Sequence, residues 1–233
     1  MADLKLSVLD VIPLRVGQTT ADALVASREM ARLADRLGYT RYWVAGHHNM
    51  TASVSSVALW LLGSSAYSAR LAASMGLPYV FANHFNIPGM EQVVATYREN
   101  FVPSAQHPEP KTLVPVNAIV APTEEEAQKR GLVQRLSFAR MRTGGRIEPA
   151  PSVEDLEGYA WTAAELAAGR PGPPFTYIGT PEVVARELCD LARKVGADEV
   201  MVAPSGGTFA AESPTSGAGR SQTLELLAAQ LLD

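Results

Sequence analysis

Short apolar runs alternate with amphipathic stretches along most of this 233-residue chain. Six of these runs are almost continuously apolar, which is typical of strands buried on both faces of a parallel sheet. The strands predicted from them are residues 6–10, 42–45, 59–62, 79–82, 113–120 and 199–203. Between the strands, apolar residues recur at helical spacing. The first of these stretches holds Ala23, Ala26, Met30, Leu33, Ala34 and Leu37. The alternation predicts a parallel α/β sheet, either open or closed into a barrel.

Two segments interrupt this alternation. Residues 143–176 are rich in glycine and proline, which predicts a long excursion within one domain spanning 1–233. Residues 204–222 are rich in Gly, Ser and Thr and predict a loop before a final amphipathic helix. Thr19 or Thr20 is expected to cap the first helix. The remaining chain makes about six strand–helix units at roughly 30 residues each.

Composition and charge narrow the class of protein. Hydrophobic residues make up 47% and charged residues 19%, which is ordinary for a globular chain. The net charge of −4 argues against nucleic acid as a partner, because such a partner normally requires a basic patch. The single cysteine, Cys189, lies in a helical run and is expected to be a buried structural thiol. No apolar run approaches the roughly 18 residues of a membrane span, and the N-terminus lacks signal-peptide features. We expect a soluble, cytoplasmic protein that does not bind membranes.

The strongest local signal for a ligand is the segment Gly63-Ser64-Ser65, with Ser68 one turn later. A predicted strand here leads into a helix N-terminus, where free N–H groups and the helix dipole favour an anion such as phosphate. The alternative is that Ser64 or Ser65 only caps the helix. The segment is neither a Walker loop nor GxGxxG, and Tyr67 occupies the position where a nucleophile elbow requires glycine.

Other polar residues follow predicted strands, where ligands bind in parallel sheets. His47 and His48 are adjacent, so their side chains point to opposite sides and form a poor metal-chelating pair; we predict no metal site. One of them is a candidate general acid or base, or only a hydrogen-bonding loop histidine. Asn83 and His84 either line the ligand edge or form a polar loop, and Asp10 either orients a ligand or caps a loop.

Four segments of the chain resemble the bacterial-luciferase-like flavin monooxygenases. They are LSVLDVIPLRVGQTTADAL, LADRLGYTRYWVAGHHNM, LWLLGSSAYSARLAASMGLPYVFANHF and IGTPEVVARELCDLARKVGADEVMV. The resemblance implies a TIM-type barrel, a flavin (FMN or, alternatively, a deazaflavin), and oxidation of a small organic substrate with oxygen. It also implies a homodimer, and a flavin reductase is a possible supplier of reduced flavin.

The resemblance assigns roles to individual residues. His47 matches the histidine usually linked to catalysis. The glycine-serine turn that binds the flavin phosphate falls on Gly63, Ser64 and Ser65, with Tyr67 and Ser68 just inside the helix. Because they end predicted strands, Asp10 and His84 join this expected cofactor-binding set.

The chain departs from the family pattern at two places. Gly46 stands where the family usually has a glutamate before the two histidines. Near Ser56–Ala58 the chain runs directly into LWLLGSS, where family members have two further strand–helix units. We therefore predict an internal deletion and a TIM-barrel-like (β/α) fold shortened to about six units. Two alternatives to the enzyme stay open: a non-catalytic flavin-binding protein that has lost part of its active-site wall, and a hydrolase using Ser65 and His84, for which no acid partner is visible.

Overall fold

The computed structural model describes residues 4–44, 60–83, 89–144, 148–168, 176–213 and 215–232. The elements in these ranges are β1 (Lys5–Asp10), α1 (Thr20–Arg36), β2 (Arg41–Val44), β3 (Leu61–Gly63), α2 (Ala66–Ser74), β4 (Tyr79–Phe81), α3 (Met90–Glu99), β5 (Thr112–Val120), α4 (Glu124–Arg142), α5 (Val153–Glu157), α6 (Ala163–Ala168), β6 (Thr176–Gly179), α7 (Pro181–Val195), β7 (Glu199–Pro204) and α8 (Ala218–Leu231). None of the helices within these ranges is long and apolar enough to cross a membrane.

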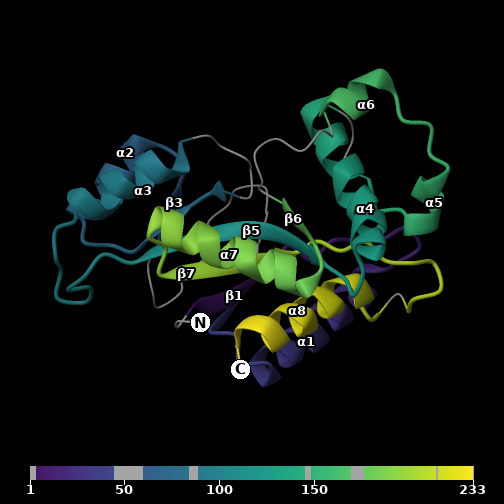
Figure 1. Ribbon diagram of the computed structural model, residues 1–233, viewed down its shortest axis with the longest axis horizontal. Helices are drawn as coiled ribbons and strands as arrows, with labels where there is room; N and C mark the ends of the chain where they lie inside the picture. Colours follow the sequence, from purple (N-terminus) through teal and green to yellow (C-terminus); the bar gives the residue numbers. More distant parts are fainter. Residues whose placement is uncertain are drawn as a thin grey trace.

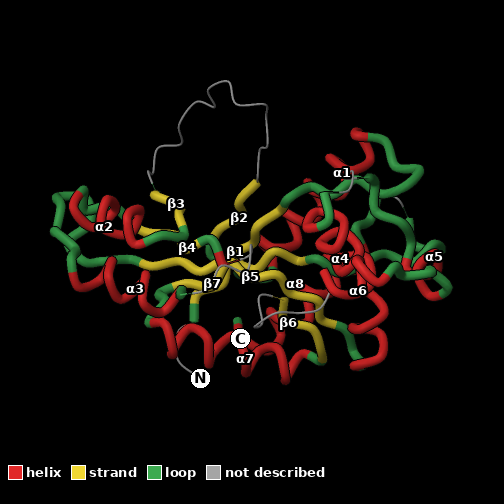
Figure 2. Tube along the Cα trace, turned by 90° about the horizontal axis from the view of Figure 1, so that it is seen from above, coloured by secondary structure: helices red, strands yellow, loops and turns green. Residues whose placement is uncertain are grey.

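The described strands form one sheet in which every pairing between strands is parallel. The strand order is β2-β1-β7-β5-β4-β3, and β6 pairs with the far end of β5. β5 lies at the centre, and all of its residues are buried. The sheet curls into a half-barrel with helices against its outer side (Figures 1 and 2). This confirms the predicted class, a shortened TIM-barrel-like α/β fold.

The register of the strand pairs shows where neighbouring strands end relative to one another. Pairing traced from Gly63, the last residue of β3, through β4, β5 and β7 leads to Leu6 in β1. β1 continues for four more residues, to Asp10. β3 and β4 end level with each other, whereas β5, β7 and β1 extend further toward their carboxyl ends. Because all these strands are parallel, the carboxyl ends of β3 and β1 lie on one common rim.

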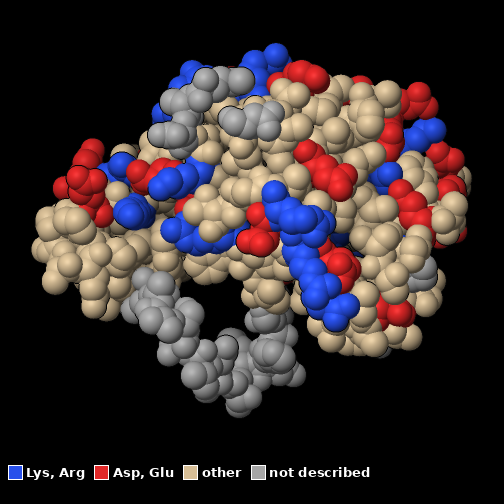
Figure 3. All heavy atoms as spheres, turned by 90° about the horizontal axis from the view of Figure 1, so that it is seen from below, with Lys and Arg blue, Asp and Glu red and all other residues tan. Residues whose placement is uncertain are grey.

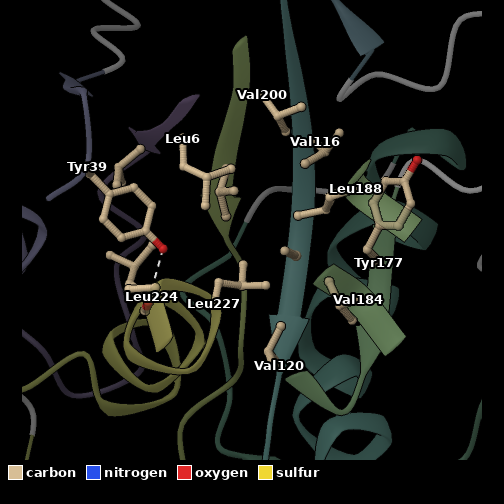
Figure 4. Packing of buried hydrophobic residues seen from close by; sticks show 14 of the residues in the cluster. Leu6, Tyr39, Val116, Val120, Tyr177, Val184, Leu188, Val200, Leu224 and Leu227 are labelled. Carbon is tan, nitrogen blue, oxygen red and sulfur yellow. Dashed lines mark hydrogen bonds between the residues drawn. The ribbon is translucent and has the colours of Figure 1, made fainter. Parts of the chain in front are cut away.

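The main core lies between the sheet and the helices outside it. Alternate strand residues such as Leu6, Val116 and Val200 contact α7 and α8, where they meet Leu188 and Leu224 (Figure 4). The intervening strand residues face the inner side of the curl, because side chains alternate along a strand. They form a smaller cluster of Val80, Leu113 and Met201 with Leu9, Trp43 and Trp60. The outer cluster thus holds the helices against the sheet.

Capping residues set several helix boundaries as expected. Thr19 is the N-cap of α1: its side chain accepts the Asp22 backbone N–H, and the Asp22 carboxylate accepts the Thr19 N–H. The same reciprocal arrangement begins α2 at Ser65. Such capping typically contributes about 1 kcal/mol to stability.

The structure differs from the prediction in the second half of the chain. The excursion predicted for 143–176 contains α5 and α6, and α5 packs against α4 through Val153 and Leu156. A seventh strand, β6, was not predicted. It has only four residues, and it forms because Asn117–Val120 of β5 extends past β4 and offers an unpaired edge. That edge is created by tertiary structure and leaves no local pattern.

The last helix also begins earlier than predicted. The loop was expected to run to Gln222, but α8 begins at Ala218 after Gly217, which adopts a left-handed φ of 56°. A Cβ on Gly219 would lie 2.3 Å from the Gly207 carbonyl oxygen. Position 219 therefore requires glycine, because the backbone of residues 206–207 packs directly against it. The local sequence does not reveal this reason.

Candidate functional site

The turn from β3 into α2 exposes a helix N-terminus at the rim. Ser65 is the N-cap: its hydroxyl accepts the Ser68 backbone N–H at 3.2 Å. The backbone N–H groups of Ala66 and Tyr67 lie in the first turn, where the helix itself provides no acceptor. This turn holds no acidic side chain. The dipole and these N–H groups therefore favour an anion here.

The side chain of Ser68 packs directly against the backbone of Gly63 within this turn. A Cβ on Gly63 would lie 2.2 Å from Ser68 Oγ, so only glycine allows the serine to pack there. Ser68 Oγ is 3.0 Å from the Tyr79 hydroxyl and donates to the Ser65 carbonyl at 2.8 Å. Burial raises the pKa of Tyr79, so its phenol remains protonated at neutral pH. Ser68 therefore shapes the turn from inside.

The other expected phosphate ligands are on the outer side of the turn. Ser64 is half-buried, and Ser65 is exposed. The Tyr67 side chain is 72% exposed. The structure therefore brings Gly63, Ser64, Ser65 and Tyr67 together around the N-terminus of α2.

Asp10 lies apart from this turn and is fully buried. Its carboxylate accepts hydrogen bonds from the Ser27 hydroxyl at 2.5 Å, the Tyr42 hydroxyl at 2.6 Å and the Ile12 N–H at 2.8 Å, and it is paired with Arg220. Burial by itself raises the pKa of Asp10, but Arg220 and the three hydrogen bonds outweigh it and hold the pKa below its usual range. Because Asp10 has the same orientation as Leu6 and Val8, it faces the helix layer. It fixes α1 and α8 to the end of β1.

Several positions singled out in the sequence lie outside the described residues. These are the candidate catalytic residue His47, its neighbours Gly46 and His48, the candidate cofactor ligand His84, and the junction near Ser56–Ala58. Their assignments stay predictions.

A cavity of about 300 Å³ lies at the carboxyl ends of β1, β5 and β7. It was not predicted, because its walls come from separate stretches of chain that carry no common motif. Its polar lining residues are Arg15, Gln18, Asn117, Gln134, Ser137, Ser205, Thr208 and Arg220. Its apolar walls include Phe138, Met141 and Pro151. The only sequence hint was the abundance of glycine in 204–222.

Hydrogen bonds fix the loops around this cavity. The loop after β1 pairs with Ala150, which accepts the Val16 N–H at 2.9 Å and donates to the Leu14 carbonyl at 2.8 Å. On the other side, the buried Arg130 of α4 donates to the Gly207 carbonyl at 2.8 Å. Arg130 is itself paired with Glu212 and with Glu126 of the same helix, each at 2.9 Å. Hydrogen bonds and ion pairs therefore hold the loops that form the cavity walls in place.

A larger hollow of about 880 Å³ lies at the opposite end of the sheet. It is lined by residues that begin strands, including Lys5, Arg41, Thr112 and Glu199. Ligands of parallel α/β folds bind at the carboxyl ends of the strands, so this amino end is the less suitable place for a cofactor. Acidic and basic side chains stand interspersed on the face of the molecule shown in Figure 3.

The turn at Gly63 and the cavity share the carboxyl rim. β4 lies between β3 and β5, so the axes of these two strands are roughly 10 Å apart across the sheet, and β5 extends further toward its carboxyl end than β3. A half-barrel of parallel strands, with a helix N-terminus suited to an anion and a ligand-sized cavity on one rim, defines an α/β protein of TIM-barrel type.

Comparison with known proteins specifies the family. The model of the luciferase-like monooxygenase family matches residues 57–199, more than half of the chain, and the protein belongs to this family. A luciferase-like monooxygenase of Escherichia coli (strain K12) is 24% identical over 302 aligned positions, covering 84% of this chain and 90% of that protein.

Two solved structures share the fold over nearly their whole length. The crystal structure of apo-MsnO8 has a TM-score of 0.76 at 24% identity and covers 97% of this chain and 98% of that one. Flavoprotein 390 has a TM-score of 0.52 at 12% identity, with coverages of 100% and 96%. At these identities the likeness establishes the fold alone.

Proposed function

We propose that the protein is a flavin-dependent oxidoreductase of the luciferase-like monooxygenase type. It would oxidise a small organic substrate with reduced flavin and oxygen. The observation that carries the proposal is the Gly63–Ser65 turn, which opens α2 on the ligand-binding rim of a chain of this family. The proposed cofactor is FMN, with a deazaflavin as the alternative, because both carry a phosphate.

The residues of the turn fit a flavin phosphate. The Ser64 and Ser65 hydroxyls and the Ala66 and Tyr67 N–H groups would hold it, and the absence of a side chain at Gly63 lets the turn close on Ser68. The bound flavin supplies the redox chemistry, while the protein orients it and excludes water. His47 follows β2 and is proposed to act as acid or base near the flavin ring.

A non-catalytic flavin-binding protein is the second candidate function. Two observations favour it: Gly46 replaces a carboxylate beside His47, and the alignment to the E. coli relative is 302 positions long, although this chain has 233 residues. Such a difference of length supports an internal deletion, which we place near Ser56–Ala58. Flavoprotein 390, whose fold this chain matches almost end to end, is by its name a flavoprotein.

A titration with FMN and riboflavin tests the phosphate placement. We expect FMN to bind, and Ser64→Asp to weaken FMN binding more than riboflavin binding, because a carboxylate repels only the ligand that carries a phosphate. Ser74→Asp adds the same charge at the other end of α2 and serves as the control. Equal losses for both ligands would refute the placement, and no binding of either ligand would remove both flavin functions.

Oxygen uptake separates the enzyme from the flavin-binding protein. With a flavin reductase supplying reduced FMN, the enzyme should consume oxygen faster than the reductase alone in the presence of its substrate, and His47→Ala should slow it. Flavin binding without this acceleration favours the non-catalytic protein.

We also propose a homodimer that covers the edge strands β2 and β3, where Val44 and Leu62 are each 58% exposed. Sedimentation velocity measures whether the protein is a dimer in solution.

A further inference from the structure

The cavity at the carboxyl ends of β1, β5 and β7 is lined by two arginines, Arg15 and Arg220, and none of its described lining residues is a carboxylate. Arg220 is 7% exposed and is neutralised by Asp10 directly behind it. Arg15 is half-buried, and within the described residues its guanidinium donates to two backbone carbonyls, those of Ser213 at 3.1 Å and Phe209 at 3.5 Å.

Acidic groups near Arg15 are already engaged. Glu212 is the acidic residue whose charge acts on Arg15, but its carboxylate accepts hydrogen bonds from Arg130 at 2.9 Å and from the Phe209 N–H at 2.9 Å. Within the described residues, no carboxylate lies within ion-pair distance of Arg15. Among the described residues Arg15 therefore makes no ion pair, although Glu212 acts on it from a distance, and its guanidinium can bind the anionic group of a ligand.

Two further features make the same end of the cavity attractive to an anion. Gly217, which lines the cavity, precedes the N-terminus of the 14-residue helix α8, and the first turn of that helix holds no acidic residue. The Nε–H of the buried Arg220 has no hydrogen-bond partner within the described part of the chain. A buried donor without an acceptor is unfavourable unless a ligand or water completes it.

The remainder of the cavity suits an apolar body. Phe138 and Met141 of α4 form one side, and Ala23 and Ala26 of α1 form another. The volume of about 300 Å³ is at the lower limit of sites for small organic ligands. The cavity thus combines an apolar chamber with one arginine that makes no ion pair among the described residues, which matches a small organic anion with an apolar body.

We propose that this cavity is the substrate site and that the substrate is a small apolar carboxylic acid whose carboxylate is held by Arg15. The planar guanidinium forms two parallel hydrogen bonds to a carboxylate, which gives both affinity and orientation. This proposal rests on the proposed function above, because it names the substrate class of the same rim. The flavin phosphate at the N-terminus of α2 and the substrate carboxylate would then occupy different parts of that rim.

Calorimetric titration with n-alkanoates from butanoate to decanoate, each paired with its amide, tests the proposal. We expect at least one alkanoate to bind more tightly than its amide. Arg15→Gln should weaken the alkanoate by about tenfold or more and leave the amide unchanged, because a charge-assisted hydrogen bond is lost. Arg28→Gln is the matched control, since Arg28 is an exposed arginine of α1 that does not line the cavity.

A second variant keeps the test valid if Arg15→Gln unfolds the loop. Ser137→Met fills the cavity from α4 without changing any charge, and it should weaken alkanoate and amide together. FMN titrations of the same variants separate the two proposals. Alkanoate binding that depends on Arg15 without any FMN binding refutes the flavin function and leaves the anionic cavity supported. FMN binding with no preference for alkanoates over amides overturns the cavity proposal, and so does an equal loss of FMN and alkanoate affinity in Arg15→Gln.

Discussion

Asp10→Asn tests whether one buried ion pair joins the end of β1 to the helices outside it. Both partners are almost fully removed from water: the side chains of Asp10 and Arg220 are 0% and 8% exposed. Substitution by asparagine keeps the size but removes the charge, which leaves Arg220 buried and unpaired. It also deprives both Ser27 and Tyr42 of a charged acceptor, because their hydroxyls donate to the same carboxylate oxygen, Oδ2.

The expected loss follows from this burial. Breaking a buried ion pair by removing one partner typically costs 3–5 kcal/mol. An asparagine oxygen in the place of Oδ2 can still accept the Ser27 and Tyr42 hydroxyls, so we expect the lower end of this range, about 3 kcal/mol. Domains of this size lose roughly 2–4 °C of Tm per kcal/mol, which gives a decrease of about 6–12 °C.

Urea denaturation and thermal melting followed by circular dichroism measure the change. Asp190→Asn is the matched control, because Asp190 makes an ion pair with Arg193 on the exposed surface of α7 and such pairs contribute little. If Asp10→Asn lowers stability no more than Asp190→Asn, the buried pair does not hold these elements together and the reasoning is wrong.

The same pair predicts how stability depends on pH. The folded pKa of Asp10 is lower than its ordinary value of 3.8, so the folded state favours the ionised carboxylate. The stabilisation is therefore fully present above the unfolded pKa and is lost as the pH falls through the folded pKa. The stability difference between the wild type and Asp10→Asn should be constant from neutral pH to about 5 and decrease below about 4. A constant difference down to pH 2 contradicts the assignment.

Two further predictions concern the walls of the site. Gly63→Ala should lower both Tm and FMN affinity, because the added methyl would lie 2.4 Å from Ser68 Cβ; Gly158→Ala, whose methyl enters open space, should do neither. Arg130→Met should lower Tm and speed proteolysis within 204–213, because it removes the hydrogen bond that holds this loop to α4. Lys129→Met, which removes a neighbouring exposed ion-pair partner, should leave the cleavage rate unchanged, and equal cleavage in the two variants would contradict this role.

Local patterns of apolar and polar residues predict much of the fold. Strands buried on both faces must be continuously apolar, and helices packed on one side must repeat every 3.6 residues, so six strands and most helices could be predicted. Caps such as Thr19 work through neighbouring residues and are equally visible. The exceptions depend on distant partners. β6 pairs with the protruding end of β5, and the glycine inside α8, Gly219, is explained by the Gly207 backbone that packs against it.

In the candidate site, too, one part follows from the local sequence and another part depends on distant contacts. The sequence by itself determined the turn at Gly63, because a strand that leads into a serine-capped helix is a local arrangement of a few residues. Only the tertiary structure decided that Asp10 faces the helices and pairs with Arg220, whereas the guanidinium of Arg15 donates to backbone carbonyls. Arg15 and Arg220 are some two hundred positions apart in the chain, and they line one cavity only after the sheet has curled.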